Sequence, residues 1–276
     1  MEKPEKISFH LHLVSDSTGE TLNTVAKAVM GQFEIAQPQE HSYALVRTHR
    51  QLERVLSQIA AQPGMVFCTM VDVDLEKALL DQCATLNVPC VPVLDNSIAA
   101  VSAYLGTGAS HRPGGQHSLD SEYFERIETL NYTMAHDDGQ RLDTLEEADV
   151  VLVGVSRTSK TPTCIYLAHR GVKAANVPIV PEIAVPESVK TLKKPLVVGL
   201  TLNPDRLIQI RRNRLLALRE GSETDYTDIE TVKAEVKIAR RLFAERGWPV
   251  IDVTRRSIEE TAAAVLNLYQ QKVDSE

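Results

Sequence analysis

The sequence has no closely spaced pair of cysteines and no hydrophobic run long enough to cross a membrane. Its four cysteines are scattered over 276 residues without a Cys-x-x-Cys pair, which argues against a zinc site or a disulfide framework. The longest apolar stretches fall well short of the roughly 18 residues of a membrane span, and Met1–Lys6 leads into no secretory segment. We therefore expect a cytoplasmic protein with no membrane partner.

An excess of positive charge is also missing. The net charge of -7 and the isoelectric point near 5.7 remove the broad electrostatic footprint of a nucleic-acid-binding protein, so we expect no nucleic-acid partner. With 276 residues, of which 43% are hydrophobic, the chain can form two modest α/β domains or one large one. No internal sequence repeat is visible, although the two halves could share the same layering.

Short apolar runs alternate with longer amphipathic segments along the chain, a pattern typical of β-α-β units. Strands are predicted over residues 9–15, 42–47, 64–69, 88–94, 149–154, 175–180, 196–201 and 249–253. Helices are predicted over residues 21–33, 51–62, 74–86, 97–105, 121–135, 160–170, 204–219, 229–246 and 257–271. With right-handed crossovers, this order predicts an α/β fold: an N-terminal doubly wound, mostly parallel sheet followed by a P-loop kinase-like α/β domain.

A glycine-rich stretch, residues 106–116, interrupts this periodicity and could be a linker or a functional loop. We predict an N-terminal α/β domain over residues 1–105, a connecting region with this loop and a helix over 106–145, and a nucleotide-binding domain over 146–276. Within the loop, His111, Arg112 and His117 could contact phosphate or a protein substrate. A solvated loop is the other interpretation.

The segment Gly154–Thr161 has the position of a phosphate-binding loop, between an apolar strand and a helix. In such a loop the backbone N–H groups and the helix N-terminus point at the anion, Lys160 supplies a positive charge and Thr161 a hydroxyl for Mg²⁺. Ser159 replaces the usual glycine, so its backbone must avoid a left-handed conformation or accept strain. The alternative is an ordinary turn in which Ser156 or Ser159 caps the helix and Lys160 is solvated. The candidate nucleotide-binding residues are Gly154, Val155, Ser156, Arg157, Thr158, Ser159, Lys160 and Thr161.

The segment His136–Gly139 carries two adjacent carboxylates, Asp137 and Asp138. Such a pair could take a proton from an acceptor hydroxyl or help to position Mg²⁺. An Asp-Asp-Gly sequence is equally typical of a surface turn in which Gly139 takes a positive φ. Both interpretations remain open at this point.

Two further groups of polar residues could contact phosphate. Near the N-terminus, Ser15, Ser17 and Thr18 follow a strand and could cradle an anion on exposed amides, or they could simply cap the next helix together with Asp16. Later in the chain, a predicted helix carries several arginines among leucines. It could be an ordinary amphipathic helix, or arginines such as Arg211 and Arg212 could close over a phosphate as a lid.

Four stretches together resemble one protein family, the regulatory proteins of pyruvate, phosphate dikinase and of phosphoenolpyruvate synthase. These stretches are HLVSDSTGETL, LNYTMAHDDG, ADVVLVGVSRTSKTPTCIYLAHRGVKAANVPIVPE and LTLNPDRLIQIRRNRL, and the resemblance runs over nearly the whole chain. It implies a bifunctional enzyme that phosphorylates a threonine of its target with ADP as donor. It also implies removal of that phosphate by inorganic phosphate, with release of pyrophosphate.

The resemblance also implies where the nucleotide binds and which enzyme is the target. ADP is expected on Gly154–Thr161. We infer from the residues themselves, and not from the resemblance, that Lys160, Asp137 and Asp138 are the catalytic residues and that Thr161 contacts the Mg²⁺ carried by the nucleotide. Regulators of the synthase typically end this loop in Cys-Gly-Lys-Thr and those of the dikinase in Thr-Ser-Lys-Thr, which is the sequence of residues 158–161. The dikinase is therefore the expected partner. A small-molecule P-loop kinase, a noncatalytic nucleotide sensor and a homodimer are all compatible with the residues.

Overall fold

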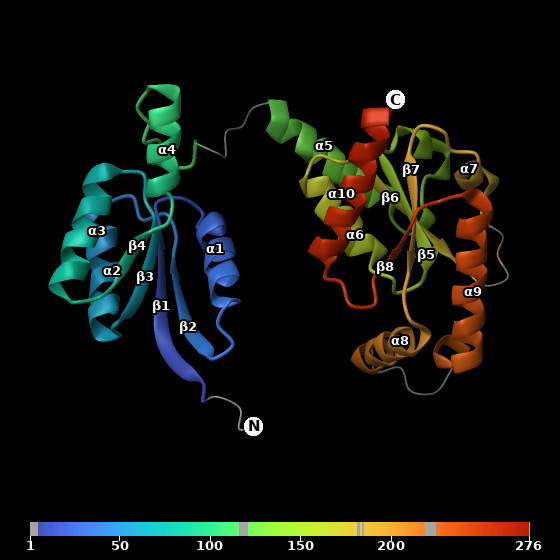
Figure 1. The fold of residues 1–276 in the computed structure, drawn as a ribbon, viewed down its shortest axis with the longest axis horizontal. Coiled ribbons are helices and arrows are strands. Elements are labelled where there is room, and N and C mark those ends of the chain that lie inside the picture. Colours follow the sequence, from blue (N-terminus) through green and yellow to red (C-terminus); the bar gives the residue numbers. More distant parts are fainter. Residues whose placement is uncertain (1–4, 116–120, 181–182, 184, 219–224, 276) are drawn as a thin grey trace. The chain divides into compact units, whose positions relative to one another are not determined.

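The computed structural model describes residues 5–115, 121–180, 183, 185–218 and 225–275. Contacts within the chain divide it into two compact units, Met1–Ser118 and Leu119–Glu276, each of which we describe by itself (Figure 1). The glycine-rich loop belongs to the first unit, and the helix before His136 belongs to the second. The predicted connecting region is thus divided between the two units.

The first unit is a four-stranded parallel sheet in the order β2-β1-β3-β4, with helices on both faces. Its strands are β1 (Ile7–Ser15), β2 (Ala36–Tyr43), β3 (Gly64–Thr69) and β4 (Cys90–Pro92). Its helices are α1 (Glu20–Met30), α2 (His49–Ala61), α3 (Val73–Thr85) and α4 (Asp95–Leu105). Helix α1 covers one face of the sheet, and α2 and α3 pack together on the other (Figure 1).

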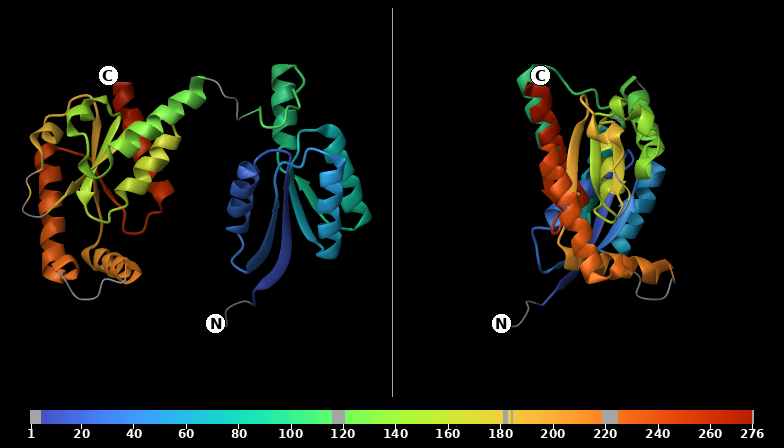
Figure 2. Two further views of the ribbon diagram at one scale, coloured as in Figure 1. Left: turned by 180° about the vertical axis from the view of Figure 1, so that it is seen from behind. Right: turned by 90° about the vertical axis from the view of Figure 1, so that its right-hand side faces the viewer.

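The second unit is again a four-stranded parallel sheet, in the order β6-β5-β7-β8. Its strands are β5 (Val150–Val155), β6 (Ala174–Ile179), β7 (Leu196–Thr201) and β8 (Val250–Asp252). Its helices are α5 (Ser121–Ala135), α6 (Lys160–His169), α7 (Glu187–Lys190), α8 (Pro204–Leu218), α9 (Ile229–Arg246) and α10 (Ile258–Ser275), with short 3₁₀ helices η2 (Asp137–Gly139), η3 (Leu142–Glu147) and η4 (Asp225–Thr227). Helices α5, α6 and α10 pack on one side of this sheet and α9 on the other (Figure 2).

The two sheets therefore share one topology, and the predicted α/β fold class with parallel sheets is confirmed. In each sheet the first strand in the chain lies between the second and the third, so the chain direction across the sheet reverses beside it. Ligands of open parallel sheets bind at this switch point, outside the carboxyl ends of the strands. It is the place where β1 leads into α1 and β5 leads into α6.

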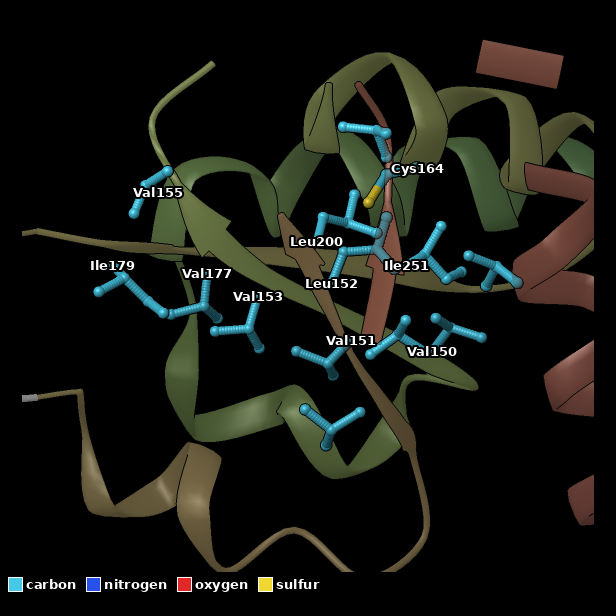
Figure 3. Close-up of a cluster of buried hydrophobic side chains, with 14 of the residues drawn as sticks. Val150, Val151, Leu152, Val153, Val155, Cys164, Val177, Ile179, Leu200 and Ile251 are labelled. Atoms are coloured by element: carbon cyan, nitrogen blue, oxygen red, sulfur yellow. The ribbon is translucent and has the colours of Figure 1, made fainter. Parts of the chain in front are cut away.

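The core of the second unit centres on β5. Every residue of Val150–Val155 is buried, because the strand lies between two neighbours and has helices on both of its faces (Figure 3). Such a strand needs a continuous apolar run rather than an alternating one. The same run, predicted as a strand from the sequence, thus fixes the start of the loop that follows.

Strand β2 is the element that the sequence misplaces most. Apolar periodicity predicts a strand over 42–47, whereas β2 spans Ala36–Tyr43, with Pro38 inside it and alternate residues exposed. The strand lies at the edge of its sheet, where proline and polar side chains are tolerated and the apolar signal is weak.

None of the described helices is long and apolar enough to cross a membrane.

Candidate functional site

Strand β5, the loop of residues 156–159 and α6 place the predicted phosphate-binding segment at the carboxyl edge of the second sheet. A Cβ atom built on Gly154 would lie 2.6 Å from the carbonyl oxygen of Leu200 and 2.9 Å from Thr158 Oγ1. Only glycine fits where β5 and β7 approach so closely. Thr158 is fully buried, and its hydroxyl donates to the carbonyl of Val155 at 2.9 Å, which closes the loop.

Two residues of the loop have left-handed backbone conformations, Arg157 with φ +71° and Ser159 with φ +60°. Of the two possibilities for Ser159, the structure shows the strained one: the serine takes the left-handed backbone that glycine would adopt without strain. It is also the N-cap of α6, yet its side chain makes no capping hydrogen bond, so the serine-capped turn is not observed there. Left-handed residues next to right-handed ones direct backbone N–H groups toward a common centre, which suits an anion.

Lys160 is the buried cation of this site. Its side chain is 5% exposed, and its ammonium group donates to the carbonyl of Val155 at 3.0 Å. Burial lowers the pKa of Lys160 to about 8, although the negative charges of Asp138 and Asp137 act in the opposite direction. The interpretation of Lys160 as a solvated side chain is therefore wrong. A buried ammonium group of this kind is stabilised when an anion binds beside it.

A hydrogen-bonded triad of Asp137, Thr161 and Asn176 lies beside the loop. The Thr161 hydroxyl donates to Asp137 Oδ1 at 2.9 Å, and the amide of Asn176 donates to Asp137 Oδ1 and, at 3.2 Å, to Thr161 Oγ1. Asn176 lies on β6 and is 1% exposed. The sequence does not single it out. Its one signal is a polar side chain within a buried apolar strand, where it needs polar partners.

The segment His136–Gly139 forms the turn between α5 and the rest of the unit. The ring of His136 is buried and stacks on Tyr132 at 3.8 Å, with its Nε2 2.7 Å from Thr144 Oγ1, so it anchors this turn. Gly139 has φ +76°, as predicted, and Asp138 is left-handed as well, with φ +48°. Asp138 is exposed, whereas Asp137, which belongs to the triad, is half-buried.

A cavity of about 300 Å³ connects the loop with this turn. Its lining residues are Asp138, Ser156, Arg157, Ser159, Lys160, Thr161, Pro162, Pro178 and Ile210. The cavity thus brings Lys160 and Asp138, residues of opposite charge, together at the switch point of the sheet. Asp137 is not among the lining residues and reaches the site through Thr161 instead.

Arg211 does not act as the exposed lid residue that the sequence suggested. It is 1% exposed, and its two terminal nitrogens donate to the carboxylate of Glu235 at 2.6 and 3.1 Å. The same guanidinium group donates to the backbone carbonyls of Tyr226, at 3.0 Å, and Ser156, at 3.4 Å. It therefore supports the loop from the protein interior. Arg212, its exposed neighbour on α8, stays a prediction as a phosphate contact.

Ser15 is the last residue of β1, and Ser17 and Thr18 lie in the loop between β1 and α1 of the first unit. The N-cap residue of α1 is Gly19, with φ +79°, which has no side chain to cap the helix. Asp16 instead accepts hydrogen bonds from the backbone of Val71 and Asp72, at 2.7 and 3.3 Å. The residues Ser15, Ser17 and Gly19 line a cavity of about 180 Å³ at this switch point.

The glycine-rich loop folds over the same cavity in the first unit. Arg112 and Gly114 line it, and His111 Nδ1 lies 3.1 Å from the carbonyl oxygen of Val71. Arg112 is thus placed where it could meet an anion, while His111 is occupied at the rim of the loop. His117 lies outside the described residues. Whether these residues bind phosphate stays a prediction.

Comparison with known proteins adds the family. The family described as kinase/pyrophosphorylase matches residues 11–266 of this chain. A protein of Caulobacter vibrioides is 60% identical over 260 residues, which cover 94% of this chain and 82% of that protein. Proteins of Maricaulis maris (55% over 264 residues, 96% of this chain and 94% of that one) and Hyphomonas neptunium (51% over 276 residues, 99% of each) are similar as well. All three carry the provisional name pyruvate, phosphate dikinase regulatory protein.

Among solved structures, a mitochondrial ornithine carbamoyltransferase from Coccidioides immitis aligns with 93% of this chain and 74% of its own. The TM-score is 0.24 and the identity 10%, so this likeness supports no conclusion. The sequence relatives and the family match are of a different kind, because they extend over nearly the whole chain at high identity. The chain belongs to the kinase/pyrophosphorylase family.

Proposed function

We propose that this chain is a bifunctional regulator of pyruvate, phosphate dikinase. In one direction it transfers the β-phosphoryl group of ADP to a threonine hydroxyl of the dikinase and leaves AMP. In the other direction inorganic phosphate attacks the phosphothreonine, which releases pyrophosphate and restores the hydroxyl. The names of the relatives and the Thr-Ser-Lys-Thr sequence of residues 158–161 support the dikinase as the target.

The main support for a phosphoryl-transfer site is that the buried Lys160 and the acidic Asp138 line one cavity beside the loop. Phosphoryl transfer depends mostly on alignment and on stabilisation of the charge that spreads over the phosphoryl oxygens. The loop backbone and Lys160 supply fixed positive charge of this kind without reorganisation during the reaction. In both directions the transferred group would occupy the same place, so one site could serve both reactions.

Magnesium fits this site as an ion bound together with the nucleotide. Thr161 Oγ1 and Asp137 Oδ1, 2.9 Å apart, are oxygen donors of the type that Mg²⁺ prefers. In the part of the chain that the structure describes, no group of three His, Cys, Asp or Glu side chains could hold a metal by itself. Nucleotide phosphates and water would therefore complete the set. When bound, the ion would neutralise phosphate charge.

The acceptor threonine needs a base in the kinase direction, because a hydroxyl is a poor nucleophile near neutral pH. A carboxylate of the Asp137–Asp138 pair accepts this proton as the phosphoryl group arrives. In phosphorolysis the attacking phosphate is already an anion. The departing threonine oxygen then takes up a proton, and the same carboxyl group can return it.

The test combines the purified chain with dikinase, ADP and Mg²⁺, and follows the intact mass of the dikinase. We expect one added phosphoryl group with ADP, and its removal with release of pyrophosphate when inorganic phosphate is added. Lys160→Ala and Thr161→Ala should each lower both rates by about 10²-fold or more, since they remove fixed charge and a ligand of the phosphate-bound metal. Lys233→Ala, which removes a lysine that is about half exposed on α9, is the matched control.

The same assay separates the alternatives. Phosphorylation of phosphoenolpyruvate synthase instead of the dikinase would assign the chain to the other regulator with the same chemistry. ATP-dependent labelling of a metabolite would indicate a small-molecule kinase, and ADP binding without turnover would indicate a nucleotide sensor. Near wild-type rates in both loop variants, with unchanged circular dichroism, would remove the loop from the mechanism.

A further inference from the structure

The two adjacent aspartates of η2 have different surroundings. Asp137 is half-buried and accepts hydrogen bonds on one carboxylate oxygen from Thr161 and Asn176. Asp138 is exposed, has a left-handed backbone and lines the cavity that contains Lys160. The left-handed backbone of Asp138 directs its carboxylate away from that of Asp137. The pair is therefore not a single unit with two equivalent members.

Asn176 produces this difference through both its backbone and its side chain. Its backbone N–H donates to the carbonyl of His136 at 3.2 Å, which fixes the start of the turn against β6. Its side-chain amide donates to Asp137 and Thr161. The result is a clamp that holds Asp137 toward Thr161 and away from the cavity wall.

The orientation of the Asn176 amide supports a role beyond packing. With its amide nitrogen on Asp137 and Thr161, its carbonyl oxygen Oδ1 is buried, and no donor among the described residues reaches it. A buried acceptor without a donor is costly, and native structures keep few of them. Reversing the amide would place that oxygen against the carboxylate of Asp137. The amide of Asn176 thus keeps its two hydrogen bonds to Asp137 and Thr161, while its own carbonyl oxygen goes without a donor.

We propose that Asn176 is a positioning residue that commits Asp137 to the metal-binding hydroxyl of Thr161 and leaves Asp138 as the carboxylate that meets the acceptor threonine. This division rests on the proposed function. Asp137 and Thr161 then serve the nucleotide-bound Mg²⁺, and Asp138, facing the cavity, is the proton acceptor in the kinase direction. Asn176 touches neither substrate and acts through Asp137.

The first test compares Asp137→Asn with Asp138→Asn. Calorimetric titration gives the Mg²⁺ concentration at which ADP binding is half-maximal, and the dikinase assay gives kcat. Asp137→Asn should raise the required Mg²⁺ concentration about 10- to 100-fold. Asp138→Asn should leave that concentration unchanged and lower kcat by about 10²-fold or more, as expected for a lost base.

The second test addresses Asn176 itself. Asn176→Ala frees the Asp137 carboxylate and should raise the Mg²⁺ requirement about 10- to 100-fold, as the loss of groups that orient metal ligands does. In Asn176→Asp, a second carboxyl group lies against Asp137. At low pH this group keeps its proton and can donate a hydrogen bond to Asp137, as the Asn176 amide does. Below pH 8, where Lys160 keeps its charge, the ratio of its Mg²⁺ requirement to that of the wild type at the same pH should therefore approach one at low pH and rise with pH.

Thr163→Val is the matched control, because Thr163 is also a buried polar residue of this unit and its hydroxyl has no partner in the described part of the chain. It should leave the Mg²⁺ requirement unchanged. An equal rise in Asp137→Asn and Asp138→Asn, or no rise in folded Asn176→Ala, overturns the division of roles. The aspartate comparison decides the matter even if the Asn176 variants fail to fold. If the wild type does not bind ADP at all, the proposed function and this inference both fail.

Discussion

At the scale of single residues, Ser159 shows how a departure from a motif is accommodated. The residue keeps the left-handed backbone that glycine normally provides at the end of a phosphate-binding loop, with φ +60° and ψ +23°. A side chain in this conformation costs about 1–2 kcal/mol relative to an ordinary backbone. The surrounding fold therefore determines the conformation of the loop, because serine by itself does not favour a left-handed backbone.

Ser159→Gly should consequently stabilise the protein or leave its stability unchanged. Relief of the left-handed strain is offset by the extra backbone entropy that glycine loses on folding, about 0.5–1 kcal/mol. We expect a change in the free energy of unfolding between about 0 and 1 kcal/mol in the stabilising direction, measured by urea denaturation. Ser156→Gly, at a position without positive φ, should be destabilising by a similar amount. A clear loss of stability in Ser159→Gly would contradict this account of the loop.

Lys160 makes anion binding dependent on pH. Burial lowers its pKa to about 8 in the free protein, and a bound phosphate favours the charged form. Above pH 8 the free protein has lost this proton and must take one up when the anion binds, so the affinity for ADP should fall by up to about tenfold per pH unit. Below pH 8 the lysine is already charged and contributes no pH dependence. Calorimetric titration of ADP at several pH values measures this, and an affinity that stays constant well above pH 8 would show that Lys160 keeps its charge.

At the scale of elements, the Arg211–Glu235 pair joins α8 to α9 and holds the loop after β5. The two side chains are 1% and 8% exposed and form two hydrogen bonds. The guanidinium group also lies over the ring of Tyr226, 4.4 Å from its centroid, and reaches the carbonyl of Ser156. A pair buried in this way specifies an arrangement of elements more than it adds stability.

Glu235→Leu should therefore lower the free energy of unfolding by about 3–5 kcal/mol, because it leaves the buried charge of Arg211 without its partner. The double variant Arg211→Met with Glu235→Leu should recover most of this stability, yet it should still bind ADP more weakly, since the carbonyl of Ser156 has lost its donor. Urea denaturation and calorimetry measure the two effects. The exposed pair Lys233–Glu230 is the control, and Glu230→Gln should cost less than about 1 kcal/mol. Full recovery of both properties in the double variant would show that the pair has no role at the loop.

At the scale of the whole molecule, the chain contains the same sheet topology twice. In both units a left-handed residue, Gly19 or Ser159, stands directly before the helix that follows the central strand. The position after it differs, since Glu20 follows in the first unit and Lys160 in the second. At this position the first unit therefore has a carboxylate and the second an ammonium group, which suits an anion. Whether the chain forms a homodimer stays a prediction, which a mass measurement in solution would test.

Because each unit has a core of its own, ADP should stabilise the second unit selectively. A ligand at 100 times its dissociation constant adds about 2.7 kcal/mol to the stability of the unit that binds it. In scanning calorimetry, ADP and Mg²⁺ should therefore raise the melting temperature of the second unit by several degrees and leave that of the first unit unchanged. Lys160→Ala should abolish this rise. A separately expressed fragment of residues 119–276, if it folds, assigns the two transitions to the two units. A rise confined to the transition of the first unit would show that the nucleotide does not bind at the loop.

The α/β class, most of the helices and interior strands, and the place of the loop between β5 and α6 can all be predicted from the amino-acid sequence. These features depend on local signals: an apolar run for a strand buried on both faces, an amphipathic period for a helix, and Lys-Thr at the start of α6. Strand β2 was misplaced because an edge strand with Pro38 needs little apolar character.

The side chains that act together at the loop could not be predicted, because contacts between distant segments bring them together. Arg211 is an exposed arginine by its helical pattern, and it is buried because Glu235 from another helix offers a partner. Asn176 and Asp137 are 39 positions apart, and no spacing rule connects them. They meet because β6 pairs with β5 and the turn after α5 docks on β6. Hydrogen bonds between distant segments depend on how strands pair and helices pack, which local residue patterns do not encode.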